Sequence, residues 1–170
     1  GRPKVFGVSI KDRSAILMAG RRADAAYFME EGRMVSSTYY LAQVPDWVAG
    51  WNEAKNVDAY FGRVWERVLP EAAYAQQGPD DMPNELALYG LGRTLPKRID
   101  GGETTPGPKF ASAFENSPFQ SEVLADFAKT LVERENLGRR GVTDLLCLSF
   151  STPDTIGHSY GPDSHEVMDN

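Results

Sequence analysis

Cysteine is almost missing from this chain of 170 residues, in which Cys147 is the single one. One cysteine cannot form an internal disulfide, so a framework of disulfide bonds within the chain is excluded. Its neighbours Leu145, Leu146 and Leu148 predict a buried, apolar thiol rather than a nucleophile or a metal ligand. The redox compartment therefore stays open.

Blocks of like charge and long apolar runs are also missing. The 24 acidic and 18 basic residues give a net charge of -6 and are spread along the chain, which argues against a nucleic-acid-binding surface. No run approaches the roughly 18 apolar residues of a membrane helix, so we expect neither nucleic acid nor a membrane as a partner. A small anionic substrate would then need a local group of positive side chains.

Two apolar runs, residues 4–10 and 144–150, predict strands that are covered on both faces. A short helix is expected at 14–19, where Gly20 can end it, and another helix is expected to precede the second strand. A helix that leads into a buried strand is typical of a parallel sheet with right-handed crossovers. We therefore predict an α/β fold with a central, mostly parallel sheet flanked by helices.

The second of these helices carries the strongest local signal. Ser117, Pro118 and Gln120 have the spacing of a capping box, with serine as N-cap and proline at the first helical position. Gly138 supplies a stop. Its apolar stripe predicts a helix lying on the sheet and consists of Val123, Leu124, Phe127, Ala128, Leu131 and Val132.

The remaining patterns predict a hairpin, two packing helices and a long excursion. The hairpin combines residues 25–29 and 33–39, near the edge of the sheet. Apolar spacing predicts helices at 47–51 and 60–68. Residues 70–116 are rich in glycine and proline, which indicates either a functional loop or cap, or simple disorder. The region that we expect to be a cap or insert extends over about 40–116.

Asp154 and His158 follow the strand at 144–150 in the run Asp-x-x-x-His. On a turn made tight by Gly157, a carboxylate oxygen and an imidazole nitrogen can reach one metal ion. Alternatively, the aspartate caps the next element and the histidine packs beneath Tyr160. His165 is predicted to be a solvated side chain at the start of a surface helix, and no metal is assigned to it.

Lys11 and Arg13 follow the strand at 4–10 and stand at the start of the next helix. Cations there oppose the positive end of the helix dipole by roughly 0.3 to 1 kcal/mol each. A bound phosphate would compensate, taking a point charge from lysine, a fork from arginine and helix N–H groups. Alternatively, both side chains reach solvent while Asp12 caps the helix.

Five segments together resemble alkaline phosphatases. More narrowly, they resemble the bacterial alkaline phosphatases with a threonine nucleophile that are related to type I phosphodiesterases and nucleotide pyrophosphatases. The segments are Gly7–Ile16, Ala25–Phe28, Ser36–Tyr40, Pro45–Val48 and Ser149–Pro162. Lys-Asp-Arg and Asp-x-x-Gly-His are the most specific pieces. The resemblance covers nearly the whole chain and implies an alkaline-phosphatase-like fold.

The resemblance also implies a zinc-dependent phosphomonoester hydrolase with two Zn²⁺ ions in the complete site. A threonine or serine attacks phosphorus and forms a covalent phosphoryl-enzyme, which water then hydrolyses. Asp154 and His158 would hold the zinc near the leaving group. Lys11 and Arg13 would be catalytic, holding the phosphoryl oxygens, and two cations aimed at the transferred group favour monoesters over diesters.

The resemblance places the nucleophile and one zinc carboxylate upstream of Lys11, and three further zinc ligands downstream of His158. None of these is found in the sequence, and Gly1 to Lys4 show neither an initiator methionine nor a signal peptide. We therefore expect an incomplete domain from an enzyme about three times as long, inactive alone and prone to self-association through open sheet edges. Pro153 and Thr155 depart from the family pattern, where we expect a small polar residue and an aromatic one.

Two other interpretations stay open. One is a type I phosphodiesterase or nucleotide pyrophosphatase, or a sulfate-ester hydrolase of the same superfamily, and the other is a noncatalytic α/β module that binds an anion or a metal. The expected partner is a small phosphate ester. By resemblance, we expect the protein in the periplasm or outside the cell.

Overall fold

The computed structural model describes residues 1–170 and divides them into two compact units. The first, called here the sheet unit, comprises Gly1–Asn56 and Glu122–Ser151. The second, called the loop unit, comprises Val57–Ser121 and Thr152–Asn170. None of the helices combines the length and the apolarity needed to cross a bilayer.

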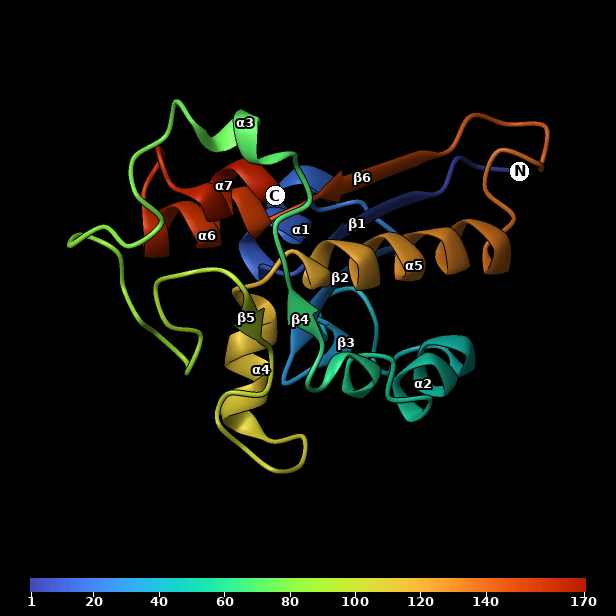
Figure 1. The fold of residues 1–170 in the computed structure, drawn as a ribbon. Coiled ribbons are helices and arrows are strands. Elements are labelled where there is room, and N and C mark those ends of the chain that lie inside the picture. The colour runs from blue at the N-terminus through green and yellow to red at the C-terminus, as the bar shows by residue number, and fades with distance from the viewer. The chain divides into compact units, whose positions relative to one another are not determined.

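The sheet unit is built on four strands in the order β3-β2-β1-β6 (Figure 1). These are β1 (Val5–Ser9), β2 (Ala25–Glu30), β3 (Arg33–Ser36) and β6 (Leu145–Ser149). Strand β1 pairs in parallel with both β2 and β6, while β3 pairs antiparallel with β2. The prediction of a mostly parallel sheet is confirmed, and the predicted hairpin lies at its edge.

The hairpin turn follows from its two central residues. Glu31 has φ 49° and Gly32 has φ 76°, and a two-residue loop with positive φ at both positions matches the twist of the flanking strands. The turn pairs Glu30 with Arg33 in the ladder.

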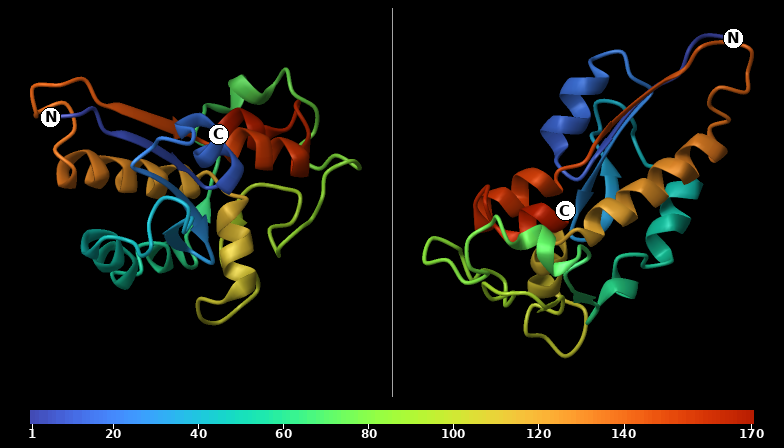
Figure 2. Two further views of the ribbon diagram at one scale, coloured as in Figure 1. Left: turned by 180° about the vertical axis from the view of Figure 1, so that it is seen from behind. Right: turned by 45° about the horizontal axis from the view of Figure 1, so that its top comes forward.

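Helices cover both faces of this sheet. The right-hand view of Figure 2 shows α1 (Asp12–Ala19) on one side and α2 (Asp46–Glu53) with α5 (Phe119–Arg134) on the other. Helix α1 lies so close to β1 that a Cβ atom at Gly7 would stand 2.2 Å from the carbonyl oxygen of Ala15. Only glycine fits there.

An aromatic cluster forms the core beneath α2 and α5. The ring of Phe127 lies 5.4 Å from Tyr27, 5.4 Å from Trp47 and 5.2 Å from Trp51, measured between centroids. These residues come from β2, α2 and α5, so the rings hold two helices on one face of the sheet. The predicted stripe of α5 is buried except at Val132, which is 36% exposed.

Strand β6 is more open than the sequence predicted. It is the outer strand of the sheet, with Leu145 52% exposed and Phe150 beyond its end 46% exposed. Cys147 is half-buried, and its Sγ lies 3.6 Å from the carbonyl oxygen of Met18. The predictions of a fully buried strand and a buried thiol are wrong because no strand covers the far side of β6.

Residues 1–170 expressed alone should self-associate through this edge, since β6 presents unpaired backbone groups beside exposed apolar side chains. Light scattering at increasing concentration is expected to show oligomers that grow with concentration. A monomer at every concentration would contradict this expectation.

The loop unit holds short elements between long irregular stretches. They are the 3₁₀ turn η1 (Asp58–Tyr60), β4 (Val64–Trp65), α3 (Glu71–Tyr74), β5 (Lys97–Arg98), α4 (Pro108–Glu115), α6 (Thr152–Tyr160) and α7 (His165–Asp169). The loop-rich character of residues 70–116 is confirmed, although α4 was not predicted. The assignment of about 40–116 as a cap or insert stays a prediction.

The helix predicted at 60–68 is wrong. Gly62 has φ 76°, which ends η1, and its N–H donates to the carbonyl oxygen of Ile99 at 2.8 Å. Strand β4 then pairs antiparallel with β5. Pairing with a distant segment therefore overrides the local apolar spacing.

The predicted capping box is also wrong, because α5 begins at Phe119 and its polar neighbours serve the preceding helix. The hydroxyl of Ser117 donates to the carbonyl oxygen of Phe114 at 2.8 Å. The side-chain amide of Gln120 donates to the carbonyl oxygen of Glu115. Both bonds satisfy carbonyl groups at the end of α4, which lack partners within that helix.

Charged side chains are buried in the core of the loop unit. Lys97 and Glu166 are fully buried and form an ion pair of 2.8 Å. Glu85 is 4% exposed. Burial raises the pKa of the Glu85 carboxyl above its usual value, against a hydrogen bond from the backbone of Met82, and the nearby charge of Glu166 raises it further. The ionised form of Glu85 is thus disfavoured in the folded state.

Glu85→Gln should therefore stabilise the protein at alkaline pH. A folded-state pKa above the unfolded value of 4.5 means that stability is lost as pH rises from that value through the folded pKa. Glutamine removes that loss, so the melting temperature of the full-length variant should exceed the wild type at pH 8 and match it near pH 4. An equal or lower melting temperature at pH 8 would refute this assignment.

Candidate functional site

Lys11 and Arg13 lie where β1 passes into α1. Lys11 is the residue before the helix, in an extended conformation, and its backbone N–H donates to Ser9 Oγ at 3.2 Å. Arg13 is exposed in the first turn. The two cations therefore flank the start of α1, at the carboxyl end of a central strand.

Asp12 is the first helical residue rather than the N-cap, so the alternative that it occupies the cap position is wrong. Its Oδ1 accepts a hydrogen bond from the N–H of Arg13 at 2.6 Å. A carboxylate in the first turn offsets part of the cost that the two cations meet at this end of the helix dipole.

The second predicted cluster, Asp154 and His158, follows the strand that pairs with β1. Strands β1 and β6 are parallel neighbours with Ser9 opposite Ser149. Two residues beyond, Ser151 Oγ lies 3.3 Å from Ser9 Oγ. In sheets of this kind, ligands bind at the carboxyl ends of the strands, and both predicted clusters follow such ends.

Asp154 and His158 belong to helix α6 rather than to a turn. They are four residues apart on one helix face, 53% and 81% exposed, with His158 Nε2 at 3.3 Å from Asp154 Oδ1. Gly157 lies inside the helix, where a Cβ atom would meet nothing within 4 Å, so a tight glycine turn is not the reason for their proximity. The alternative that His158 packs beneath Tyr160 is also wrong, because the imidazole is exposed.

The pair has the spacing of two neighbouring metal ligands. Zinc binds imidazole nitrogen and carboxylate oxygen at roughly 2.0 to 2.2 Å in a tetrahedral arrangement, which sets adjacent donors about 3.4 Å apart. The observed 3.3 Å between donor atoms fits that arrangement. No group of three or more histidine, cysteine, aspartate or glutamate side chains in the chain is placed to hold a metal, so this pair is at most part of a ligand set.

Side chains near the start of α6 are hydrogen-bonded within the loop unit. Thr152 Oγ1 lies 2.6 Å from Ser121 Oγ, and Thr155 Oγ1 lies 3.3 Å from Gln120 Nε2. Ile156 and Tyr160 are buried on the opposite face of the helix from the exposed pair. The sequence signal that was missed is Pro153 in a first turn, followed by apolar residues four apart.

His165 is buried, not solvated as predicted, with 6% exposure. Its Nε2 donates to the carbonyl oxygen of Gly78 at 3.0 Å, and its Nδ1 lies 2.9 Å from Arg67 Nη2 and 3.3 Å from Asp80 Oδ1. Arg67, Asp80 and Tyr74 also line a cavity of about 470 Å³ beside it. Because both ring nitrogens have partners, His165 fastens α7 to the preceding loops.

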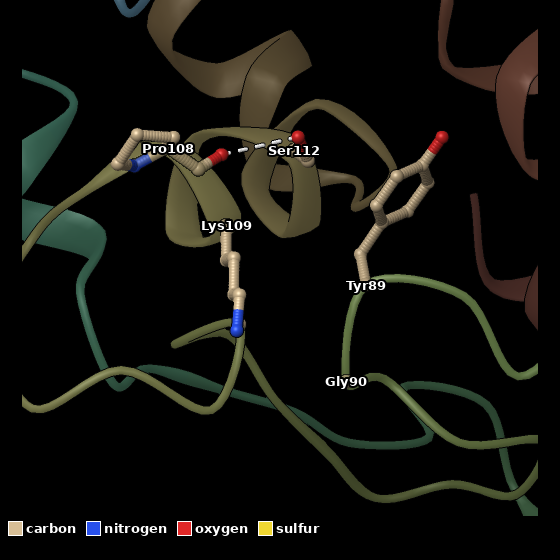
Figure 3. A pocket seen from close by; sticks show the side chains of 6 residues that line it. Tyr89, Gly90, Pro108, Lys109 and Ser112 are labelled. Carbon is tan, nitrogen blue, oxygen red and sulfur yellow. Dashed lines mark hydrogen bonds between the residues drawn. The ribbon is translucent and has the colours of Figure 1, made fainter.

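A second hollow of about 480 Å³ in the loop unit is lined by Tyr89, Lys109 and Ser112, among others. Figure 3 shows the tyrosine ring and the lysine side chain on opposite sides of it, while the Ser112 hydroxyl donates to the carbonyl oxygen of Pro108 at 3.1 Å. None of the four predicted site residues lines this hollow.

Comparison with known proteins identifies relatives along the whole chain. Residues 13–170 match the model of a family described as type I phosphodiesterase / nucleotide pyrophosphatase. Alkaline phosphatase PhoV of Synechococcus elongatus is 33% identical over 99% of this chain. A protein of Myroides odoratus named calcium-transporting ATPase is 36% identical over 98%.

Solved structures give the same result for the fold. The crystal structure of alkaline phosphatase PafA matches 98% of this chain with a TM-score of 0.81 and 28% identity. A second structure of PafA is of a variant with four substitutions: a threonine is replaced by serine, and an asparagine, a lysine and an arginine are replaced by alanine. The lysine and the arginine are two positions apart. The chain spans 30% to 32% of the length of these relatives.

Proposed function

Because the chain belongs to the type I phosphodiesterase / nucleotide pyrophosphatase family, we propose that it is part of a zinc-dependent phosphomonoester hydrolase, an alkaline phosphatase. One observation carries the proposal: two strands that lead into the predicted phosphate and metal residues are parallel neighbours with their carboxyl ends in register. Relatives named alkaline phosphatases support it.

Lys11 and Arg13 are proposed to bind the phosphoryl group. Lysine contributes a point charge, arginine contributes two parallel N–H donors, and the start of α1 contributes backbone N–H groups. The Lys-x-Arg spacing equals that of the two residues replaced in the PafA variant. The two side chains would stabilise the negative charge that is carried by the non-bridging oxygens.

Asp154 and His158 are proposed as ligands of one of two zinc ions. Their donor atoms have the separation expected for neighbouring tetrahedral ligands. When bound, zinc would supply Lewis-acid stabilisation of the leaving oxygen and would lower the pKa of water toward about 7. Further ligands and the nucleophile would come from residues outside this chain. We also propose that the reaction proceeds through a covalent phosphoryl-enzyme.

Chelation of the full-length protein tests the metal requirement. Hydrolysis of an aryl phosphate monoester at alkaline pH should disappear after dialysis against a chelator and return when Zn²⁺ is added. Calcium or magnesium alone should not restore it, because both prefer all-oxygen ligand sets. Full activity after removal of bound metal would refute zinc dependence.

A diesterase is the second candidate function, favoured by the description of the family model. In that case the space beside Lys11 and Arg13 would accept the second ester group rather than a free phosphoryl oxygen. A small phosphate ester is proposed as the substrate in either case. A location in the periplasm or outside the cell also remains a proposal.

A further inference from the structure

Two buried serine hydroxyls meet where β1 and β6 end. Ser9 is fully buried and Ser151 is 5% exposed, and their Oγ atoms lie 3.3 Å apart. The backbone N–H of Lys11 donates to the same Ser9 hydroxyl at 3.2 Å. The Ser9 side chain thus contacts both the backbone of Lys11, a proposed phosphate-binding residue, and Ser151, which follows β6.

The contact between Ser9 and Ser151 lies just beyond the point where backbone pairing between β1 and β6 ends. The last pair in register is Ser9 with Ser149, so Ser151 stands at the position that would face Lys11. Beyond that pair, the Ser9 hydroxyl contacts Ser151 and so links β1 to the segment that follows β6. Ser151 is directly followed by Thr152, the first residue of α6, and Asp154 comes three residues after Ser151.

We propose that Ser9 and Ser151 are positioning residues for phosphoryl transfer, an inference that rests on the proposed function. Their hydrogen bond fixes the backbone of Lys11 relative to Ser151, the residue that precedes α6 in the sequence. The hydroxyls need not touch the substrate. A displacement of about 1 Å at a reacting group can lower a rate roughly 100-fold. The contact would therefore affect catalysis by keeping Lys11 in place.

A purely structural role would have a different signature. Loss of a buried hydrogen bond lowers stability wherever it lies, but only a positioning bond alters phosphate binding and the preference for monoesters. Ser36 provides the matched control, because its hydroxyl donates to the carbonyl oxygen of Ala26 at 2.8 Å on the opposite edge of the same sheet. Ser36→Ala should lower the melting temperature and leave kinetics unchanged.

The test uses full-length, zinc-loaded protein with Ser9→Ala, Ser151→Ala and the double variant. Each single variant should lower kcat/KM for an aryl phosphate monoester about 10- to 100-fold and weaken inhibition by inorganic phosphate. The double variant should lose little more than Ser9→Ala, because Ser9→Ala already removes the contact that Ser151→Ala removes. Threonine and valine have nearly the same shape, but only threonine has a hydroxyl. Ser151→Thr should therefore keep the activity and Ser151→Val should lose it, which separates the effect of the hydroxyl from an effect of altered packing.

Four results would overturn the inference. If both alanine variants stay within twofold of Ser36→Ala, or if their losses multiply in the double variant, the two serines do not act together on the reaction. Equal activity of the threonine and valine variants would exclude the hydroxyl itself. If the wild type hydrolyses no monoester, the proposed function fails and the positioning role fails with it, a result distinct from the other three.

Discussion

Asp154→Ala should abolish tight zinc binding at its site in the full-length protein and lower monoesterase kcat/KM by about a thousandfold. Asp154→Ala removes one of the two ligands proposed on this helix face and leaves only the His158 imidazole of that pair. Loss of the ion would remove several kcal/mol of charge stabilisation in the transition state, and about 4 kcal/mol corresponds to three powers of ten.

Elemental analysis after dialysis measures this directly, with the zinc-to-protein ratio falling by about one ion. Asp163→Ala is the control, because Asp163 is an exposed carboxylate in the loop after α6 and lies outside the proposed pair. It should retain the full zinc content. An unchanged zinc content in Asp154→Ala would remove the metal role from this residue and from His158.

Arg13→Ala should lower kcat/KM for a phosphate monoester about 100- to 1000-fold, the range found for removing one donor to a developing oxyanion. Diester hydrolysis should fall only a few-fold. A monoester presents one more anionic oxygen than a diester does, and the exposed guanidinium at the start of α1 is the donor proposed to bind it. The ratio of kcat/KM for the monoester to kcat/KM for the diester therefore tests the role of Arg13.

Arg13→Lys keeps the charge and loses the two-pronged donor, so it should fall between the wild type and Arg13→Ala. Arg22→Ala supplies the control, since Arg22 is an exposed cation in the turn after α1 and should leave the ratio unchanged. If Arg13→Ala leaves the monoester-to-diester ratio unaltered, the phosphate-binding role of Arg13 is refuted.

Local patterns predicted the sheet and its helices where neighbouring residues decide the outcome. Continuous apolar runs identified β1 and β6, and Gly32 identified the hairpin turn, because positive φ there is a local requirement. The pattern at 60–68 failed, since Gly62 and pairing with the distant strand β5 replaced a helix by a short strand. Exposure of β6 could not be predicted, because it depends on what lies beside the strand.

In the candidate site, too, local features could be predicted from the sequence and contacts between distant residues could not. The types of residue at 11, 13, 154 and 158 predict phosphate and metal binding, which stays a prediction. The turn assigned to Asp154 and His158 is a helix, in which a spacing of four brings the side chains together equally well. Burial of His165 depends on Arg67 and Gly78, about 90 residues away in the sequence. Contact between Ser9 and Ser151 likewise requires the strand register.

The ratio of kcat/KM for matched aryl phosphate monoester and diester substrates should strongly favour the monoester in zinc-loaded, full-length protein at alkaline pH. Lys11 and Arg13 would then be acting on the transferred phosphoryl group. Preference for the diester would contradict the assignment as an alkaline phosphatase and place the protein among the phosphodiesterases, and absence of hydrolysis of both substrates would contradict an enzymatic role.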